Sequence, residues 1–210
     1  MICRLRSFCF TLLKDEGHGR INVKDPFLDI KIIKKRGARI TLNGDLIIKS
    51  HLMGTSPVRI ILKEGSLLIV DGQFIIGNGV KISLERGARL EIGGKNKESA
   101  SGITSDSLVM VNKRIRIGSD FIGAWNLFIS DSDWHSINNR PHQKDVIVGN
   151  HVWAANNTNI LKGSLVGDGC IIAGFTKLIN KTYGSNLLIA GSDGKVIRED
   201  ISWSRDISGE

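Results

Sequence analysis

Apolar residues recur at every sixth position through the last third of the chain: Val148, Ala154, Ile160, Val166, Ile172 and Leu178. Small or β-branched residues stand four positions after each of the first five: Val152, Thr158, Ser164, Cys170 and Thr176. A helix repeats every ~3.6 residues and an ordinary strand every ~2, so neither explains this period. A flat strand about five residues long, followed by a tight corner, does explain it. Three such strands close a triangular coil, and stacked coils form a solenoid with both residue sets pointing inward.

A less regular strand–turn–strand pattern repeats through the first half of the chain. Residues 32–42, 60–69 and 82–92 each show a strand, a turn at a glycine and a second strand. Their irregular spacing predicts coils with short insertions, and the polar residues 95–102 predict a loop. Regular coils resume near Ile115.

The pattern divides the chain into three parts. We expect a parallel β-helix over residues 25–185, with a loop near 138–145 that breaks the repeat and protrudes. Residues 186–210 depart from the repeat and predict an irregular C-terminal cap. Residues 1–24 predict an N-terminal arm or short helix that caps the other end. Its basic and apolar start is too short to span a bilayer, and a weak contact with a membrane surface is the alternative.

Composition narrows the choice of partners. The net charge of +8 favours phosphates, anionic lipid or an acidic glycan as ligands. Aromatic residues make up 6%, and no basic tract is interleaved with them, so we do not expect nucleic acid to bind. The 3 cysteines are an odd number without metal-ligand spacing, so we expect a reducing compartment, the cytoplasm, and no metal.

Two segments beside the regular run carry candidate chemistry. Asp131-x-Asp133-x-His135 closes one coil, and Gly149-x-x-Val152-Trp153 opens the next after the loop. With the six-residue repeat, these segments resemble the hexapeptide-repeat acyltransferases, and within them the enzymes that O-acetylate surface polysaccharides. The resemblance covers residues 115–205 well and 25–100 loosely. It implies an all-β, left-handed parallel β-helix, acetyl-CoA as the acetyl donor, and a homotrimer with each site between two subunits.

His135 is the candidate catalytic base. A hydroxyl must lose its proton as it attacks a thioester, and imidazole accepts protons near neutral pH. The residues expected to orient this ring or to bind the acceptor are Asp131, Asp133, Trp134 and His142. The alternative is that His135 is a surface histidine beside a loop.

The resemblance also implies a donor groove. Trp153 ends a hexad and should point outward, where it would pack on the pantetheine arm or on a neighbouring subunit. A backbone N–H near Ala155 is expected to stabilise the oxyanion. The full set carried over for CoA binding is Trp153, Ala155, Asn156, Gly174, Lys181, Lys195 and Arg198. Ala155 stands where the family has glycine, which puts the individual contacts in doubt.

Other functions remain open at this stage. An N-acetyltransferase for an amino sugar-nucleotide would share the base and the groove, whereas a non-catalytic β-solenoid would need neither. A zinc site built from His135, His142 and His151 is disfavoured because their spacing does not match successive coils. His151 is expected at an exposed corner of a hexad.

Overall fold

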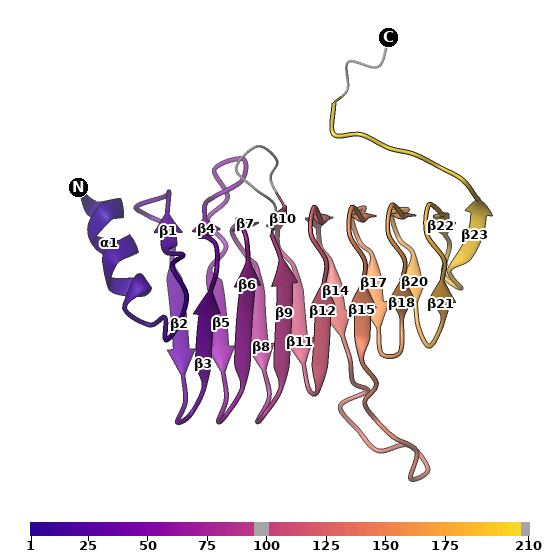
Figure 1. The fold of residues 1–210 in the computed structure, drawn as a ribbon, viewed down its shortest axis with the longest axis horizontal. Coiled ribbons are helices and arrows are strands. Elements are labelled where there is room, and N and C mark those ends of the chain that lie inside the picture. Colours follow the sequence, from indigo (N-terminus) through magenta and orange to yellow (C-terminus); the bar gives the residue numbers. More distant parts are fainter. Residues whose placement is uncertain (95–100, 207–210) are drawn as a thin grey trace.

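The protein is a left-handed parallel β-helix with a short helix at its N-terminal end (Figure 1). The computed structural model describes residues 1–94 and 101–206. In Figure 1 the chain winds from α1 (Ile2–Thr11) at one end of the prism to the C-terminal segment at the other. Among the described residues, no helix has the length and apolar content needed to cross a membrane.

Three sheets form the sides of the prism in the part of the chain that the structure describes. The first sheet contains β1 (Ile21–Val23), β4 (Leu46–Ile48), β7 (Phe74–Ile76), β10 (Gly102–Ser105), β13 (Ile122–Trp125), β16 (Trp153–Ala154), β19 (Ile171–Ile172), β22 (Leu188–Ala190) and β23 (Lys195–Arg198). The second contains β2 (Ile30–Lys34), β5 (Val58–Leu62), β8 (Lys81–Leu84), β11 (Leu108–Val111), β14 (Phe128–Ser130), β17 (Asn159–Leu161) and β20 (Lys177–Leu178). The third contains β3 (Arg39–Leu42), β6 (Leu67–Asp71), β9 (Arg89–Gly93), β12 (Arg114–Ile117), β15 (Val146–Val148), β18 (Leu165–Val166) and β21 (Thr182–Tyr183).

The six-residue repeat has the orientation that the sequence predicts. All six apolar residues of the repeat are buried, and so are the five small or β-branched ones. Pairing advances by three hexads per coil, since Ile147 lies beside Leu165 and Asn159 beside Lys177. The interior is therefore filled with side chains, and the ligand sites must lie on the outside.

The strand–turn–strand pattern expected in the first half of the chain is also present. Strands β2 and β3, β5 and β6, and β8 and β9 are joined by turns at Gly37, Gly65 and Gly87. Each glycine has φ near +70°, a conformation that L side chains rarely adopt. The coils here are longer, because Arg39 lies beside Leu67 and Leu67 beside Arg89.

Both ends of the β-helix extend slightly beyond the expected limits. Strand β1 begins at Ile21, four residues before the expected start at 25, and pairs with β4. Strand β22 still stacks in parallel on β19, and only β23 turns back antiparallel to close that end. Residues 95–100 of the predicted polar loop and 207–210 of the predicted cap lie outside the described residues, while Gly102 already belongs to β10.

Candidate functional site

Residues 131–145 leave the prism between β14 and β15 and form the protruding loop seen in Figure 1. Its two legs pair, because the N–H of Asp133 donates to His142 O at 2.7 Å and the N–H of Lys144 donates to Asp131 O at 2.9 Å. At the tip, Asn138 and Asn139 both have positive φ, as in the two-residue turns of tight hairpins. The loop begins earlier than the predicted 138–145 because these pairings start at residue 131.

His135 lies on this loop between the paired legs and the tip, and it is exposed. The preceding Trp134 has φ of +64°, which costs a bulky residue about 1–2 kcal/mol. Two hydrogen bonds hold it there: its backbone N–H donates to Ser132 Oγ and its indole N–H to Ser130 Oγ, both at 3.0 Å. The His135 ring is thus presented to solvent from an anchored backbone.

Asp131 does not orient the His135 ring as expected. It is fully buried, and its carboxylate accepts the backbone N–H groups of Asn112, Lys113 and Arg114 at 2.6–2.7 Å. Burial raises the pKa of this carboxyl, an effect that the three N–H donors oppose. Through these hydrogen bonds, Asp131 attaches the start of the loop to the turn before β12.

Asp133 and His142 also support the loop. The Asp133 carboxylate forms an ion pair with Lys162, whose Nζ also donates to Pro141 O at 3.3 Å. His142 Nδ1 and Ser132 Oγ are hydrogen-bonded at 3.0 Å. Sequence reasoning missed Lys162, although the register that places Leu161 beside Ser130 puts Lys162 next to the start of the loop.

The predicted donor residues begin at a different corner of the prism. Trp153 points outward from β16 with 39% of its surface exposed, as predicted. Asn156 and Gly174 lie in successive turns between the first and second sheets, and a Cβ added to Gly174 would lie 3.2 Å from Asn156 Oδ1. The backbone N–H of Ala155 itself donates to Ile172 O at 2.9 Å within the first sheet, so the oxyanion donor expected near Ala155 would be another N–H of this turn.

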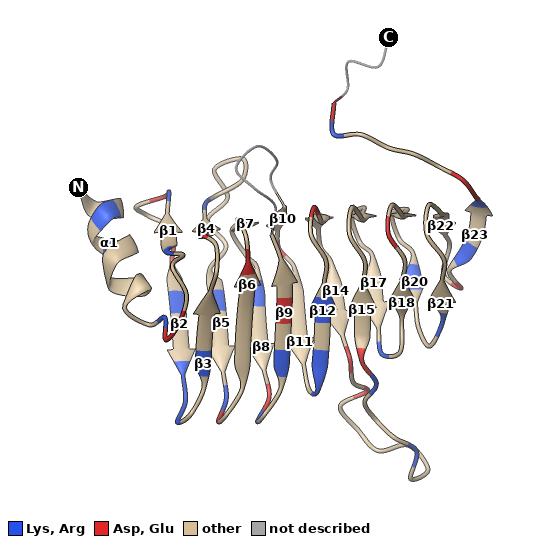
Figure 2. Ribbon diagram, viewed as in Figure 1, with Lys and Arg blue, Asp and Glu red and all other residues tan. Residues whose placement is uncertain are grey.

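Two of the predicted cations meet at Asp193, in the turn after β22. Lys181 Nζ donates to the Asp193 carbonyl, and Lys195 Nζ lies 3.5 Å from its carboxylate. Arg198, on β23, is exposed. Figure 2 shows positive charge on β23 at this end of the prism.

His151 is not simply an exposed corner residue, contrary to expectation. Its Nδ1 lies 2.7 Å from Asp120 Oδ2, its Nε2 lies 3.0 Å from Trp203 O, and its ring stacks on Trp203 at 3.9 Å. Arg205 donates to Asp120 Oδ1 at 2.8 Å. Residues 199–206 therefore return from β23 across the outside of the first sheet, a long-range contact that no local sequence signal announces.

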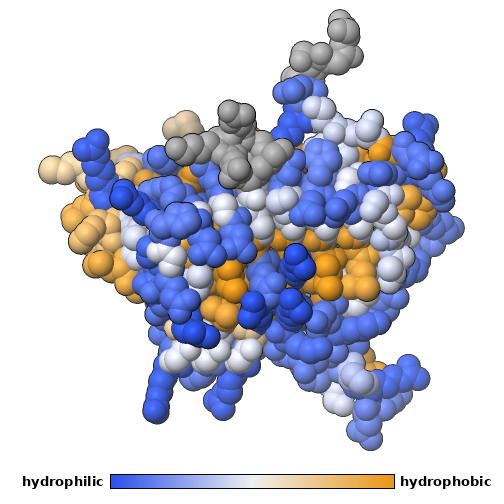
Figure 3. Space-filling view, viewed as in Figure 1, coloured by the Kyte–Doolittle hydropathy of each residue, from blue (hydrophilic) through white to orange (hydrophobic). Residues whose placement is uncertain are grey.

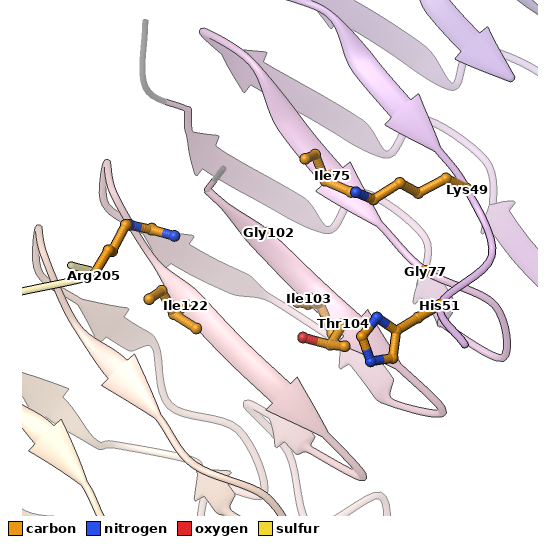
Figure 4. Close-up of a pocket in the computed structure, with 9 residues that line it drawn as sticks. All are labelled: Lys49, His51, Ile75, Gly77, Gly102, Ile103, Thr104, Ile122 and Arg205. Carbon is orange, nitrogen blue, oxygen red and sulfur yellow. The ribbon is translucent and has the colours of Figure 1, made fainter. Parts of the chain in front are cut away.

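A hollow of about 220 Å³ lies on the outside of the first sheet near this returning segment. Its floor contains Ile75 and Ile122, with Gly102 leaving space between them. Figure 4 shows Lys49 and His51 on one side and Arg205 on the other. Lys49 offers a cation beside the apolar floor, whereas the guanidinium of Arg205 is already paired with Asp120.

Two of the histidines in the disfavoured zinc set have other partners, since His142 contacts Ser132 and His151 contacts Asp120. Within residues 1–94 and 101–206, no group of three or more His, Cys, Asp or Glu side chains is arranged to hold a metal ion.

The loop and the donor turns lie on different edges of one chain. His135 follows the second-sheet strand β14, whereas Asn156 and Gly174 precede the second-sheet strands β17 and β20. A strand of three residues spans about 10 Å, so a full side of the prism separates the two edges. One chain therefore does not bring the candidate base and the donor turns into one cluster.

Comparison with known proteins identifies relatives. The chain is 31% identical over 150 residues to a polysialic acid O-acetyltransferase of Neisseria meningitidis, covering 69% of this chain and 68% of that protein. It is 28% identical over 99 residues to a putative lipopolysaccharide biosynthesis O-acetyl transferase, WbbJ, of Escherichia coli K12, and this match spans half of that protein and 40% of this chain. No family model matches the chain.

Solved structures agree with the fold. The crystal structure of the polysialic acid O-acetyltransferase OatWY matches with a TM-score of 0.54 at 25% identity, covering 92% of both chains. That of the polySia-specific acetyltransferase NeuO matches with a TM-score of 0.51 at 20% identity, covering 93% of this chain and 90% of the other, and supports the fold alone. The repeat, the protruding histidine loop and these relatives lead to one conclusion: the chain is an acyltransferase that belongs to the hexapeptide-repeat O-acetyltransferase family.

Proposed function

We propose that this enzyme transfers an acetyl group from acetyl-CoA to a hydroxyl of a surface polysaccharide or of its sugar precursor. The observation that carries the proposal is His135, exposed on an anchored loop in a chain related to a polysialic acid O-acetyltransferase. The second relative, named for lipopolysaccharide biosynthesis, supports the same class of acceptor. The hollow beside Lys49 would suit an acidic sugar.

His135 would act as the general base. As the acceptor oxygen attacks the thioester carbonyl, its proton passes to the imidazole; the C–S bond then breaks and the CoA sulfur takes up a proton. The transfer would be direct, within a ternary complex. A thiol intermediate is disfavoured because Cys170 is buried, with its pKa raised by burial, while Cys3 and Cys9 lie on α1 at the far end of the prism.

The donor would lie along the turns that contain Asn156 and Gly174. Trp153 would pack against the pantetheine arm from the outer face of β16, and the backbone around Ala155 would line the groove. The cations Lys181, Lys195 and Arg198 would face the nucleotide phosphates. Because the cysteines are free and acetyl-CoA is the donor, we propose that the enzyme acts in the cytoplasm.

A homotrimer would complete the site. One side of the prism separates His135 from the Asn156–Gly174 turns, and the filled interior leaves no cleft between them. Cyclic assembly would place the loop of one subunit against the donor turns of the next, giving three equivalent sites.

The first test is the variant His135→Ala, with His18→Ala as a matched control at the other end of the chain. We expect His135→Ala to lower kcat about a hundredfold or more while CoA affinity, measured by calorimetry, stays nearly unchanged. His18 is exposed and remote, so its variant should retain normal turnover. Near-normal turnover by His135→Ala would remove this residue from the chemistry. Product analysis with acceptors that offer a hydroxyl or an amine separates O-acetylation from N-acetylation.

The second test addresses the shared site. Co-expressing His135→Ala with Gly174→Trp, which would obstruct the donor turns, should restore part of the activity that each variant lacks alone. Mixed trimers would contain some sites with an intact loop from one subunit and intact turns from the other. A fully active monomer in light scattering would overturn the assembly.

A further inference from the structure

Helix α1 docks on the prism with its polar side. Arg6 donates to the carbonyls of Asp25, Pro26 and Leu28 at 2.6–3.2 Å. Ser7 Oγ accepts the N–H of Val23 at 2.9 Å, and Thr11 Oγ1 accepts the N–H of Ile21 at 3.0 Å. Hydrogen bonds from polar side chains, with some packing by Phe10, therefore attach the helix to β1 and the chain after it.

The outward side of α1 is apolar. The large apolar residues here that are more than half exposed are Met1, Ile2, Leu5, Phe8 and Leu12. At about 100° per residue they fall on one continuous strip, with the exposed Cys9 among them. Figure 3 shows this strip as an orange surface at the N-terminal end of the molecule. A helix on a globular surface usually turns its polar face to water, so α1 has the reverse orientation.

Positive charge borders the apolar strip. A groove of about 730 Å³ between α1 and β1 is lined by Arg4, Arg20 and Lys24, together with Phe8. In the described part of the chain, the side chains of these three cations form no ion pair. The acids nearby are engaged elsewhere: Asp15 pairs with Lys34, and the Asp45 carboxylate accepts hydrogen bonds from the Arg20 backbone N–H and from Asn22.

We propose that this end of the prism docks on the surface of a bilayer that contains anionic lipid. The apolar strip of α1 enters the boundary between headgroups and acyl chains, and Arg4, Arg20 and Lys24 contact lipid phosphates. The helix, with ten residues, lies on the bilayer and does not cross it. A second copy is the poorer occupant, because pairing two α1 faces would bring the three unpaired cations of each copy together.

Vesicle co-sedimentation tests the proposal. The full chain is mixed with vesicles of phosphatidylcholine alone, or of phosphatidylcholine with about one third phosphatidylglycerol. We expect binding to the anionic vesicles that weakens as salt is added. The variant Leu5→Gln/Phe8→Gln replaces two apolar side chains of the strip with glutamine, which is a good helix former. The variant Arg4→Gln/Arg20→Gln/Lys24→Gln removes the three cations. Each set should weaken vesicle binding by about tenfold or more, and only the cation set should reduce the salt dependence.

Matched controls exclude a general effect of surface change. Met53→Gln/Phe175→Gln removes two apolar side chains away from α1 that are even more exposed than Leu5 and Phe8, and should leave vesicle binding unchanged. Thermal unfolding checks that each variant is folded. Binding of the wild-type chain that Leu5→Gln/Phe8→Gln does not reduce would overturn the proposal, as would the absence of binding to anionic vesicles. Self-association without lipid that the same variant abolishes would also overturn it, in favour of a second copy.

Discussion

The N-terminal coils (residues 21–94) and the C-terminal coils (residues 146–190) solve the same packing problem with different side chains. In the first, strands reach five residues and the interior holds large residues such as Leu42, Leu68 and Leu90. In the second, strands have two or three residues, and small residues such as Ala154 and Thr158 share the interior with larger ones such as Ile160. Long strands with large interior residues tolerate irregular coils, whereas short strands between tight corners require a strict repeat.

This difference between the two regions matches the separate functions that we propose for them. The strict coils repeat the same turn at the same place, so Asn156 and Gly174 lie in register and can line one extended ligand. The loop with His135 interrupts the repeat immediately before those coils begin. The irregular coils carry the helix and the basic groove that we assign to surface docking.

The largest effect on stability should come from the interior of the N-terminal coils. Phe74 is fully buried there, and Phe74→Ala should lower the free energy of unfolding by about 3–5 kcal/mol, because a large cavity remains. Urea unfolding measures the change. Phe27→Ala, at an exposed site, is the control and should change stability by less than about 0.5 kcal/mol. If Phe74→Ala and Phe27→Ala lowered the free energy of unfolding by similar amounts, the N-terminal interior would be able to collapse into the space left by Phe74.

The C-terminal coils should be sensitive to the opposite change. Ala154→Leu adds volume where the interior accepts a small residue, and should cost about 1–3 kcal/mol of unfolding free energy through overpacking. Ala124→Leu, at an outward position of β13, serves as the comparison and should be tolerated. If urea unfolding showed the same stability for Ala154→Leu and Ala124→Leu, the interior of the short coils would be able to accommodate a larger side chain.

Sequence reasoning located the fold more completely than the site. The hexads specify which side faces inward, so Val148 to Leu178 and the burial of Cys170 followed directly from the pattern. The motif located the histidine loop but misassigned Asp131, because a local Asp-x-Asp-x-His pattern does not show that a carboxylate caps a turn in an adjacent coil. Lys162 and Trp203 were missed since their contacts depend on stacking and on the path of the tail.

The loop offers a smaller and more selective test. Lys162→Met removes the ion pair with Asp133 and should lower turnover about tenfold by loosening the backbone near His135. Unfolding free energy should fall by about 1 kcal/mol, because both side chains of the pair are only partly exposed. Steady-state kinetics with Lys177→Met as control provides the comparison. Unchanged turnover would show that the loop keeps its geometry without Lys162.

The smallest effect on activity is expected at Cys170. Cys170→Ser should keep most of the activity and cost about 1 kcal/mol, because serine also fits a small inward position. Burial raises the pKa of this thiol, so a thiol reagent should label Cys9 in the folded enzyme and reach Cys170 only after unfolding. Loss of activity in a folded Cys170→Ser enzyme would assign this thiol a role in turnover.

The returning segment at Trp203 and Arg205 changes how the molecule can come apart. A solenoid with contacts only between neighbouring coils can fray from its end one coil at a time. Here the tail links the last coil to His151, two coils earlier, and to Asp120, three coils earlier, so these contacts hold the end of the prism closed. Strands β16, β19 and β22 should then open as one cooperative unit, with similar protection of their amides from hydrogen exchange.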